Sequence, residues 1–358
     1  MKKRIAHIST AHYSDDPRIV YKECYSLAKK YDVHLFCLKG ANSNNLLLKG
    51  ITFKPLKKNR KLIKRIFGNQ FKVLSLCKKH DIEVAHLHDP ELIISAFILK
   101  ILGKKVVFDI HENFHRRNYK NKNLKLFFMS LFQKFYILLE KVAQYFLDYI
   151  VVADDDIKRN FSGSNVKIIS NYPQRTNYLE ATRNKIIYIG DISSNRGFEY
   201  FDRISLIAKK YDLDFNLYGR WESPSRDYYC GYLNYDDIPK VLQGSILGIC
   251  LLKKTENYIN AVPTKMYEYL RNGVPAICSD FDVIKRKFDD VKGVYYVNPD
   301  QFEETLDVVD KVLNELINNY ENHKIIRESF NLKNYDWQKE EEKLFKVYSE
   351  ILIENTTN

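Results

Sequence analysis

The sequence predicts an α/β protein with two successive domains, each built on a parallel β-sheet. Short apolar runs alternate with amphipathic helical segments from the N-terminus onward, which is typical of a sheet whose two faces are covered by helices. A turn-rich passage over residues 170–184 interrupts the alternation, which then starts again. A chain of 358 residues is also long for a single hydrophobic core. We therefore expect two Rossmann-like domains that join near residue 172.

The short apolar runs are the expected strands, over residues 4–9, 33–38, 84–88, 105–111 and 149–154, and then 185–193, 214–219, 246–252, 275–280 and 293–297. The expected helices lie between them, over residues 17–31, 71–80, 91–103 and 126–147, and then 198–211, 265–271 and from the last strand to the end. In the helix over 265–271, Thr264 is the expected N-cap and Asn272-Gly273 the expected stop.

Charge is distributed unevenly along the chain. Residues 1–170 hold 32 Lys and Arg against 15 Asp and Glu, a net charge of +17, whereas the remainder holds 25 against 30, a net charge of −5. The basic stretch 54–79 contains apolar residues at helical spacing, namely Leu62, Ile63, Ile66, Phe67 and Phe71. Such a segment fits the surface of an anionic membrane, but it equally fits a solvated helix face over the domain's own core. Nucleic acid is a third interpretation.

Cysteines and apolar stretches indicate the compartment. Six scattered cysteines without a CxxC motif are expected to be buried thiols in a reducing environment. The N-terminus has basic residues but no apolar run after them, so no signal peptide is predicted. The two most lipid-like stretches, residues 92–103 and 124–142, are interrupted by Lys before the ~18–20 residues that a membrane span needs. We expect a cytoplasmic protein that does not cross a membrane.

Polar residues follow the predicted strands, where parallel sheets bind ligands. They occur in HISTAHYSDDPR, HLHDPE and FDIHEN, and later in YIGDISSNRG, LYGRW and NAVPTKMYEYLRNGVPAICSD. Each could be a cap or turn former. In the last segment, Lys265 and Glu268 share a helix face beside the helix N-terminus. This pair is either a surface ion pair or part of a site that takes an anion at the helix end.

Together these segments resemble the family 4 glycosyltransferases, which are retaining enzymes of the GT-B fold, with two Rossmann-like domains facing across a cleft. The opening STAHYSDDPRIVYKE resembles a subgroup common in bacterial surface-polysaccharide synthesis. The resemblance covers nearly the whole chain in consistent order. It implies an acceptor-binding domain over residues 1–172, completed by a C-terminal helix over 336–358, and a donor-binding domain over 173–335. The donor would be a UDP- or GDP-linked sugar.

The resemblance also implies roles for individual residues. Glu268 would hold the ribose hydroxyls, since a carboxylate accepts two hydrogen bonds from a vicinal diol. Arg196 and Lys265 would neutralise the diphosphate, and His111 would reach the donor sugar. Pro263 and Thr264 would place backbone N–H groups of a helix end against the same phosphates. The expected catalytic residues are therefore His111, Arg196, Lys265 and Glu268.

Other residues would complete the two binding sides. The donor pocket would add Gly190, Tyr218, Gly219 and Asn260, and the acceptor side would be lined by His12, Asp15, Asp16, Arg18, His88 and Asp89. Two positions depart from the family pattern. Asn260 stands where the family has a second glutamate, and Asp191 follows Gly190 where the family often has Arg. These departures make the bound sugar less predictable and place more of the phosphate binding on Arg196 and Lys265.

No metal or other cofactor is expected. The sequence contains two DxD-like motifs, Asp280-Phe281-Asp282 and Asp154-Asp155-Asp156, but the family carries an Asp at the first position without a metal. Arg196, Lys265 and the helix dipole would stabilise the leaving diphosphate instead. Its phosphate oxygen would take the acceptor's proton, with retention of anomeric configuration.

The predicted reaction transfers a sugar to a lipid-linked or free saccharide at the inner face of the plasma membrane, with the basic residues 54–79 against anionic lipid. One alternative is a nucleotide-sugar epimerase on the same fold, which would not need a basic acceptor surface. Another is a non-enzymatic protein that binds nucleic acid or membrane. Nucleic-acid binding would require exposed aromatic residues in the basic run. Only Phe67 and Phe71 occur there, both on its apolar face, so no nucleic acid is expected.

Overall fold

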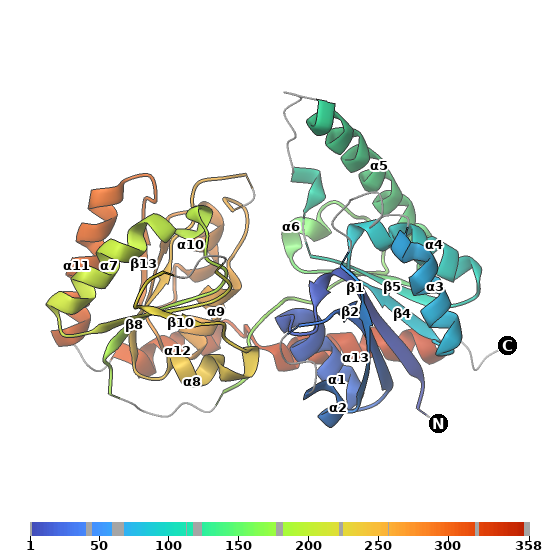
Figure 1. Ribbon diagram of the computed structural model, residues 1–358, viewed down its shortest axis with the longest axis horizontal. Coiled ribbons are helices and arrows are strands. Elements are labelled where there is room, and N and C mark those ends of the chain that lie inside the picture. Colours follow the sequence, from blue (N-terminus) through green and yellow to red (C-terminus); the bar gives the residue numbers. More distant parts are fainter. Residues whose placement is uncertain are drawn as a thin grey trace. The chain divides into compact units, whose positions relative to one another are not determined.

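The computed structural model describes residues 2–40, 45–58, 68–111, 113–116, 124–176, 182–221, 225–256, 258–318 and 322–353. The chain forms two compact units, Met1–Asn171 together with Trp337–Asn358, and Tyr172–Asp336 (Figure 1). Each unit contains one sheet in which every described pairing is parallel. The predicted α/β class with two parallel sheets is therefore confirmed. The binding roles predicted for the two domains stay predictions.

The first unit has a seven-stranded sheet of order β3-β2-β1-β4-β5-β6-β7. Its strands are β1 (Arg4–Tyr13), β2 (Asp32–Leu38), β3 (Ile51–Leu56), β4 (Val84–Leu87), β5 (Lys105–Ile110), β6 (Tyr149–Val152) and β7 (Val166–Ile168). Its helices are η1 (Pro17–Cys24), α1 (Tyr25–Ala28), α2 (Asn45–Leu48), α3 (Asn69–Lys79), η3 (Pro90–Leu92), α4 (Ile93–Ile101), η4 (Phe114–Arg116), α5 (Leu124–Phe146), α6 (Asp155–Lys158) and α13 (Trp337–Ile353).

The second unit has a six-stranded sheet of order β10-β9-β8-β11-β12-β13. Its strands are β8 (Lys185–Ile189), β9 (Asp214–Tyr218), β10 (Tyr229–Gly231), β11 (Ser245–Cys250), β12 (Ala276–Ser279) and β13 (Val294–Val297). Its helices are η5 (Ser194–Arg196), α7 (Phe198–Lys210), η6 (Tyr235–Asp237), α8 (Ile238–Leu242), α9 (Thr264–Arg271), α10 (Asp282–Phe288), α11 (Phe302–Asn318) and α12 (Asn322–Leu332). In both sheets the strand order reverses next to the first strand of the unit, at β1–β4 and at β8–β11. Ligands bind at such switch points in open α/β sheets.

The first helical segment of the chain is wound differently from the prediction. Residues Pro17–Cys24 form a π-helix, η1, and only Tyr25–Ala28 continue as α-helix. The start follows from local chemistry, because the Asp16 side chain accepts hydrogen bonds from the N–H groups of Arg18 and Ile19, and proline fits the first helical position. Asp16 is therefore a helix cap, which accounts for it without an acceptor.

The last helix, α13, is held by the first unit. The indole N–H of Trp337 donates to the Ser26 hydroxyl at 3.1 Å, and the Tyr348 hydroxyl lies 2.8 Å from Nδ1 of His86. Both aromatic side chains are buried. The final helix thus extends the core of the first unit by tertiary contacts that are distant in sequence.

Helix α9 begins one residue earlier than the capping prediction implies. Pro263, in extended conformation, occupies the N-cap position and provides no side-chain hydrogen bond, so the prediction of Thr264 as the N-cap was wrong. Thr264 is the first helical residue. The helix ends as predicted, because Gly273 has a φ of 71° and its N–H bonds to the Leu270 carbonyl. The first turn of α9 therefore lacks a capping side chain.

Candidate functional site

In the first unit, three histidines gather at the carboxyl ends of adjacent strands. His12 lies near the end of β1, His88 directly after β4 and His111 directly after β5, and these strands are neighbours in the sheet. The rings of His88 and His111 are stacked with centroids 5.4 Å apart, and His12 meets His111 edge to face at 5.7 Å. The predicted acceptor-side residues His12 and His88 thus lie together with His111.

Asp89 holds the loop after β1 in place. Its carboxylate lies 2.9 Å from Nδ1 of His12 and accepts hydrogen bonds from the Ser9 hydroxyl and from the N–H groups of Thr10 and Ala11. Burial would raise the pKa of Asp89, but these bonds, chiefly the one to His12, lower it to about 2. Asp89 is almost fully buried, so it orients His12 and has little surface to offer an acceptor.

Arg18 is not placed as the sequence predicted. It is only 5% exposed, and its guanidinium donates two hydrogen bonds to Asp109 and one to the Ile169 carbonyl. Its Nε also lies 3.1 Å from Oε1 of Glu23. Arg18 therefore binds carboxylates inside the unit, and the expectation that it lines an acceptor surface is corrected. Asp15 is likewise buried, with its carboxylate against Gly40.

The buried ion pair orients the histidines. Burial alone would raise the pKa of Asp109, but the Arg18 guanidinium holds it well below its usual range. Asp109 in turn lies 3.3 Å from Nδ1 of His88 and 3.5 Å from Nδ1 of His111. Burial lowers the pKa of His111 well below its ordinary value, against the opposing effect of Asp109, so its imidazole is neutral at pH 7. A neutral imidazole can accept or donate a hydrogen bond at a sugar hydroxyl.

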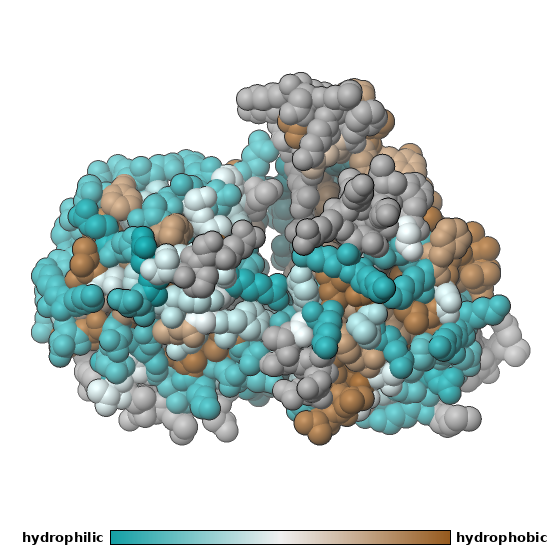
Figure 2. Space-filling view, viewed as in Figure 1, coloured by the Kyte–Doolittle hydropathy of each residue, from teal (hydrophilic) through white to brown (hydrophobic). Residues whose placement is uncertain are grey.

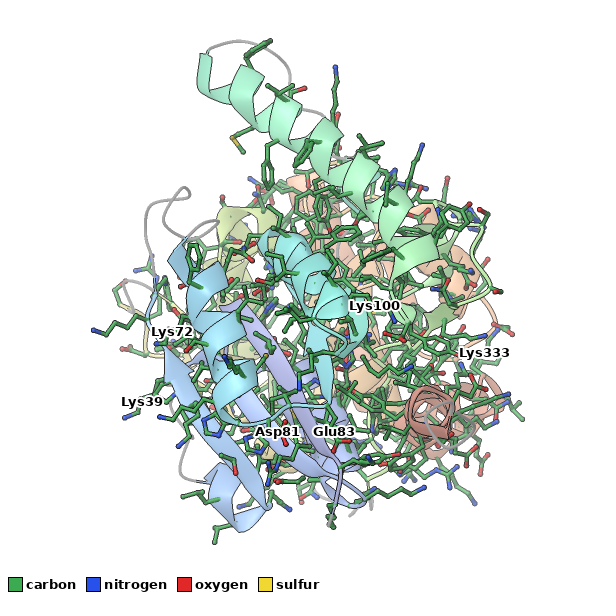
Figure 3. The ribbon with its side chains drawn as sticks, turned by 90° about the vertical axis from the view of Figure 1, so that its right-hand side faces the viewer. Lys39, Lys72, Asp81, Glu83, Lys100 and Lys333 are labelled. Atoms are coloured by element: carbon green, nitrogen blue, oxygen red, sulfur yellow. The ribbon has the colours of Figure 1, made fainter. Side chains whose placement is uncertain are left out.

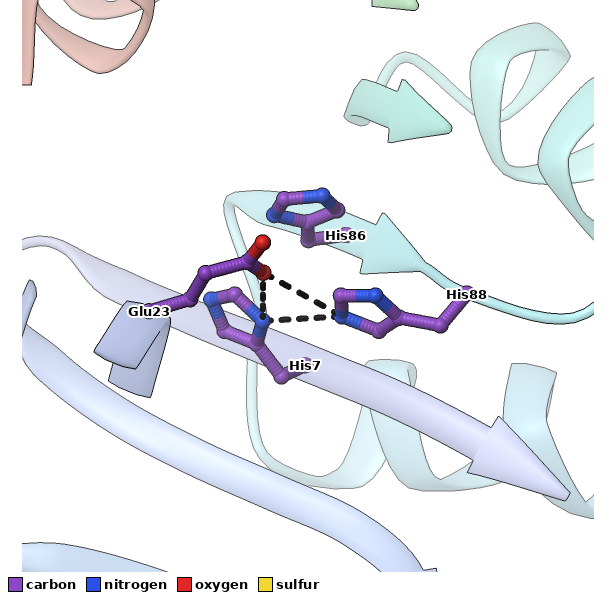
Figure 4. A group of neighbouring side chains, drawn as sticks. All are labelled: His7, Glu23, His86 and His88. Atoms are coloured by element: carbon purple, nitrogen blue, oxygen red, sulfur yellow. Dashed lines mark hydrogen bonds and ion pairs between the residues drawn. The ribbon is translucent and has the colours of Figure 1, made fainter. Parts of the chain in front are cut away.

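Three further ligand-type side chains, His7, Glu23 and His86, meet His88 of this cluster. Potential ligand atoms of His7, Glu23, His86 and His88 all lie within 4.8 Å of one another, and Nδ1 of His7 lies 2.9 Å from Nε2 of His88 (Figure 4). This is the group of described residues best able to hold a metal ion. However, Glu23 already faces the Arg18 guanidinium, which opposes a second cation there.

In the second unit, the ends of β8 and β9 approach very closely. Gly190 and Gly219 follow these strands with φ of 129° and 153°. A Cβ on Gly219 would lie 1.8 Å from the carbonyl oxygen of Gly190, and a Cβ on Gly190 would lie 3.2 Å from Nζ of Lys265. At Gly219 both the backbone conformation and the lack of space exclude a side chain, whereas at Gly190 the positive φ is what favours glycine. The Gly190 backbone also borders the Lys265 ammonium group.

Lys265 and Arg196 place two cations at this point. The same Cβ on Gly190 would lie 3.9 Å from Nη1 of Arg196, so both side chains border Gly190. Lys265 is 8% exposed, its Nζ has no hydrogen-bond partner among the described residues, and it lies 3.5 Å from the centre of the Tyr188 ring. Burial, with a smaller contribution from Arg196, lowers the pKa of Lys265 to about 7. Arg196 donates to the Tyr258 hydroxyl at 3.2 Å.

The other predicted donor residues lie on or near α9. Glu268 is buried one turn after Lys265 and accepts a hydrogen bond of 3.0 Å from the Tyr235 hydroxyl. Asn260 belongs to the half-buried stretch 258–263 that leads to Pro263, and Tyr218 ends β9 directly before Gly219. The structure thus brings Gly190, Arg196 and Lys265 together, with Glu268 further along the same helix.

Comparisons with known proteins agree with this architecture. Residues 17–171 match the family model of Glycosyltransferase Family 4. The chain resembles the structures of a sucrose-phosphate synthase from Thermosynechococcus elongatus (12% identity, TM-score 0.69) and of Anabaena HepE in complex with UDP-glucose (11%, 0.70), in each case over 98% of this chain and 100% of the other. A glycosyltransferase from Rickettsia africae is similar at 14% identity and a TM-score of 0.67, over 98% and 99% of the two chains. A search of curated proteins finds no significant match.

The chain has the GT-B fold. The predicted fold class is thereby confirmed, and the family model supports the predicted resemblance over the first unit. In this GT-B chain the histidine cluster and the Gly190–Lys265 cluster each lie at the switch point of their own sheet.

Several residues of these GT-B sites are absent from the sequence-based prediction. In the first unit they are His7, Glu23, His86, Asp109 and Tyr348, and in the second Tyr188, Tyr235 and Tyr258. Asp109 could have been noticed, since it is two residues before His111 in the same strand end. Tyr188 could also have been noticed, since it stands two residues before Gly190. Tyr235, Tyr258 and Tyr348 carry no such signal, because each is brought to its site only by the fold.

The two DxD-like motifs have structural roles in the described chain. The Asp154 side chain caps α6 by accepting from the N–H of Ile157 at 2.9 Å. Asp280 lies 3.8 Å from the Lys285 ammonium group after β12.

The predicted membrane-binding stretch 54–79 lies partly outside the described residues, which exclude 59–67. Of its predicted apolar face only Phe71 is described, and that side chain is 79% exposed. It does not pack into the core beneath α3. Among the described helices, none combines the length and apolar character needed to cross a bilayer.

Proposed function

We propose that this chain is a retaining glycosyltransferase that moves a sugar from a nucleotide-diphosphate sugar to a lipid-linked saccharide in bacterial cell-surface polysaccharide synthesis. It works without a metal ion, at the cytoplasmic face of the membrane. The family model and the GT-B fold support transfer of a sugar as the reaction class. The donor, the acceptor and the stereochemistry are inferences from the site.

One observation carries the proposal: the buried ammonium group of Lys265 without a hydrogen-bond partner among the described residues. A buried cation of this kind is costly for stability, and Arg196 next to it adds to the cost. An anionic ligand removes that cost, since phosphate oxygens supply both the charge and the missing hydrogen bonds. The arrangement is therefore understandable as a diphosphate site that is complete only with its substrate.

The surrounding backbone suits the same ligand. Helix α9 begins at Thr264, next to Lys265, and no side chain caps its first turn. The free N–H groups of this turn favour binding of a phosphate. Glu268 lies one turn further and is a carboxylate suited to the two hydroxyls of a ribose. In this pose the diphosphate lies near Gly190 and the nucleoside near Glu268. The structure of Anabaena HepE, a protein of the same fold, contains UDP-glucose, which makes UDP the first nucleotide to test.

The chemistry follows from where charge develops. When the bond between the sugar and the diphosphate breaks, the leaving group gains negative charge, and Lys265, Arg196 and the α9 N-terminus stabilise it. In this proposal the neutral imidazole of His111 hydrogen-bonds a hydroxyl of the transferred sugar. The acceptor attacks from the side of the leaving group, whose phosphate oxygen takes the proton. The anomeric configuration is then retained without a separate base.

The acceptor is proposed from charge. The excess of positive charge in residues 1–170 favours an acceptor held at an anionic bilayer, where each basic residue near the surface contributes about 1 kcal/mol. A lipid-linked saccharide is held at such a surface. The contact between residues 54–79 and the membrane, expected from the sequence, stays a prediction.

A thermal-shift panel tests the donor site. UDP, GDP, ADP, CMP and their common sugar conjugates would be added to the wild type, to Lys265→Met, to Glu268→Gln and to Lys209→Met, an exposed lysine of α7 that serves as the control. A ligand at 100 times its Kd stabilises the fold by about 2.7 kcal/mol. We expect one nucleotide diphosphate to raise the Tm of the wild type and the control but not of the two site variants.

A negative result would be equally clear. If no nucleotide shifts the wild type, or if Lys265→Met responds as the wild type does, the donor site is not where we place it. Retention is tested separately, by the proton coupling at the anomeric carbon of the product made from an α-linked donor. A β-linked product would contradict it.

A further inference from the structure

Helix α5 presents an apolar face that the rest of the described first unit leaves open. Its exposed large side chains are between 41% and 75% accessible and are Phe127, Leu131, Phe135, Leu138, Val142, Tyr145 and Phe146. At 100° per residue they occupy an arc of about 100° on one side of the helix. Tyr136 and Ala143, on the opposite side, pack into the core. The helix is thus apolar on both faces, and only one face is buried.

The open face is large for a soluble protein. With aromatic side chains of about 150–250 Å² each, seven residues that are half exposed give an apolar area on the order of 700 Å². Brown, hydrophobic residues gather on the α4 and α5 side of the first unit in Figure 2. The largest apolar patch on a typical monomer is about 300–600 Å², and larger ones mark a binding surface.

The patch continues onto α4. The ring of Phe146 lies 5.4 Å from that of Phe97, and Ile101, one turn after Phe97 on the same face of α4, is 75% exposed. Leu102 follows it and is also exposed. Two adjacent helices therefore contribute to one surface, which is wider than a single helical stripe.

Charge on this surface is positive. Helix α5 contains three lysines and one acidic residue, Glu140, which is buried against His115. Lys134 and Lys141 are exposed and lie beside the apolar arc. Lys100 of α4 reaches Asp148, just beyond α5, and Figure 3 labels it on this side of the unit. An apolar face bordered by exposed lysines and no exposed carboxylate of its own helix complements an anionic lipid surface.

We propose that α5 and the carboxyl end of α4 lie on an anionic lipid bilayer, with the apolar face at the boundary of headgroups and acyl chains and Lys134 and Lys141 at lipid phosphates. A bilayer fits better than a second copy of the chain, because two copies joined through this face would bring their lysines together. This inference rests on the proposed function, because a lipid-linked acceptor requires the enzyme to reach a membrane. It places the contact on residues other than the predicted stretch 54–79.

Vesicle sedimentation tests the surface. The full chain would be mixed with vesicles of phosphatidylcholine alone or with about one third phosphatidylglycerol, as wild type, as L131E/L138E and as Leu206→Glu. Leu206 is a matched control, since it is 61% exposed on α7 of the second unit. We expect the wild type and Leu206→Glu to sediment with the anionic vesicles, and L131E/L138E to bind at least about tenfold more weakly. K134Q/K141Q should lose the preference for anionic over neutral vesicles.

Two outcomes would overturn the proposal. One is a wild type that stays in the supernatant with anionic vesicles, or an L131E/L138E variant that sediments like it. The other is a wild type that light scattering shows to be a dimer and that L131E/L138E converts to a monomer, because the face would then join two copies. The nucleotide panel keeps these results separate from the donor site. L131E/L138E should retain its nucleotide response, since Lys265 lies in the other unit.

Discussion

At the scale of single residues, the burial of Lys265 is unfavourable for stability. Its ammonium group is buried beside Arg196, and no carboxylate among the described residues forms an ion pair with it. In the unfolded chain its pKa has the ordinary value of 10.5, so burial to a pKa of about 7 means that the folded state binds its proton more weakly. Between pH 7 and 10.5 the unfolded state binds more protons, and this residue's cost to stability shrinks as pH rises. Function explains the cost better than folding does.

The lowered pKa of Lys265 predicts how donor affinity depends on pH. Without ligand the lysine loses its proton as pH rises through about 7, whereas a bound diphosphate keeps it charged. Binding therefore takes up a proton, and the Kd for UDP-glucose should rise above pH 7 by up to about tenfold per pH unit. Calorimetric titration at several pH values between 6 and 8.5, a range that spans the pKa of Lys265, measures this dependence. Lys265→Met should bind UDP-glucose only weakly at every pH in this range, and a wild type whose Kd does not change with pH would contradict this account.

Arg18 predicts a contrast between buried and exposed ion pairs. Arg18→Leu leaves Asp109 charged and buried without its partner, which should lower the free energy of unfolding by about 3–5 kcal/mol. Arg226 also makes a two-bond pair, with Asp202, but on the surface. Arg226→Leu should leave urea unfolding unchanged within error. Equal effects of the two substitutions would show that the Arg18 pair is not the buried anchor of the histidine cluster.

At the scale of elements, the two sites arise where strands end beside a change of strand order. In the first unit the ends of β1, β4 and β5 bring three histidines together, and in the second the parallel strands β8 and β9 end in two glycines that lie against each other. Helix α9 then supplies Lys265 and Glu268 from its first two turns. Parallel sheets align the carboxyl ends of their strands, so side chains distant in sequence meet at one edge.

The close contact between Gly190 and Gly219, at the ends of β8 and β9, predicts that a side chain at Gly219 is not tolerated. Gly219→Ala would place a Cβ against the carbonyl of Gly190 and would strain a backbone with φ of 153°. The free energy of unfolding should fall by more than about 3 kcal/mol, as measured by urea unfolding. Gly68→Ala is the control, because Gly68 has a φ of −72° and its added Cβ meets no atom within 4 Å. A Gly219→Ala protein as stable as the control would show that the backbones of Gly190 and Gly219 are not in close contact.

At the scale of the whole molecule, charge and apolar surface are divided between the two units. Residues 1–170 hold the positive charge, and α5 with its open apolar face lies in the same unit. The second unit carries the cluster suited to an anion. This division is what the proposed function requires, with a membrane-held acceptor at the first unit and a soluble donor at the second.

Metal removal tests the proposed chemistry on the intact protein. Because Arg196 and Lys265 supply the positive charge at the diphosphate, treatment with EDTA should change neither the Tm nor the nucleotide-induced shift. Elemental analysis of the purified chain should find less than about one metal ion per ten molecules. A stoichiometric metal would instead point to His7, Glu23, His86 and His88, and His86→Ala should then release it.

Sequence patterns predicted some site residues better than others. Lys265 and Glu268 could be placed together because positions three apart share a helix face. The prediction of Thr264 as the N-cap of α9 was wrong because Pro263, in extended conformation, occupies that position. Arg18 was expected at a surface, since nothing in its local sequence shows that Asp109, 91 residues away, would bury it.

Periodicity and composition, which are local properties, were enough to predict the alternation of strands and helices, the two parallel sheets and the basic character of the first domain. Which polar atoms are buried without partners and which apolar faces stay open became known from the fold alone. The apolar residues of α5 illustrate the reason: spacing shows that a helix has apolar faces, but whether another element covers a face depends on packing between segments distant in the chain.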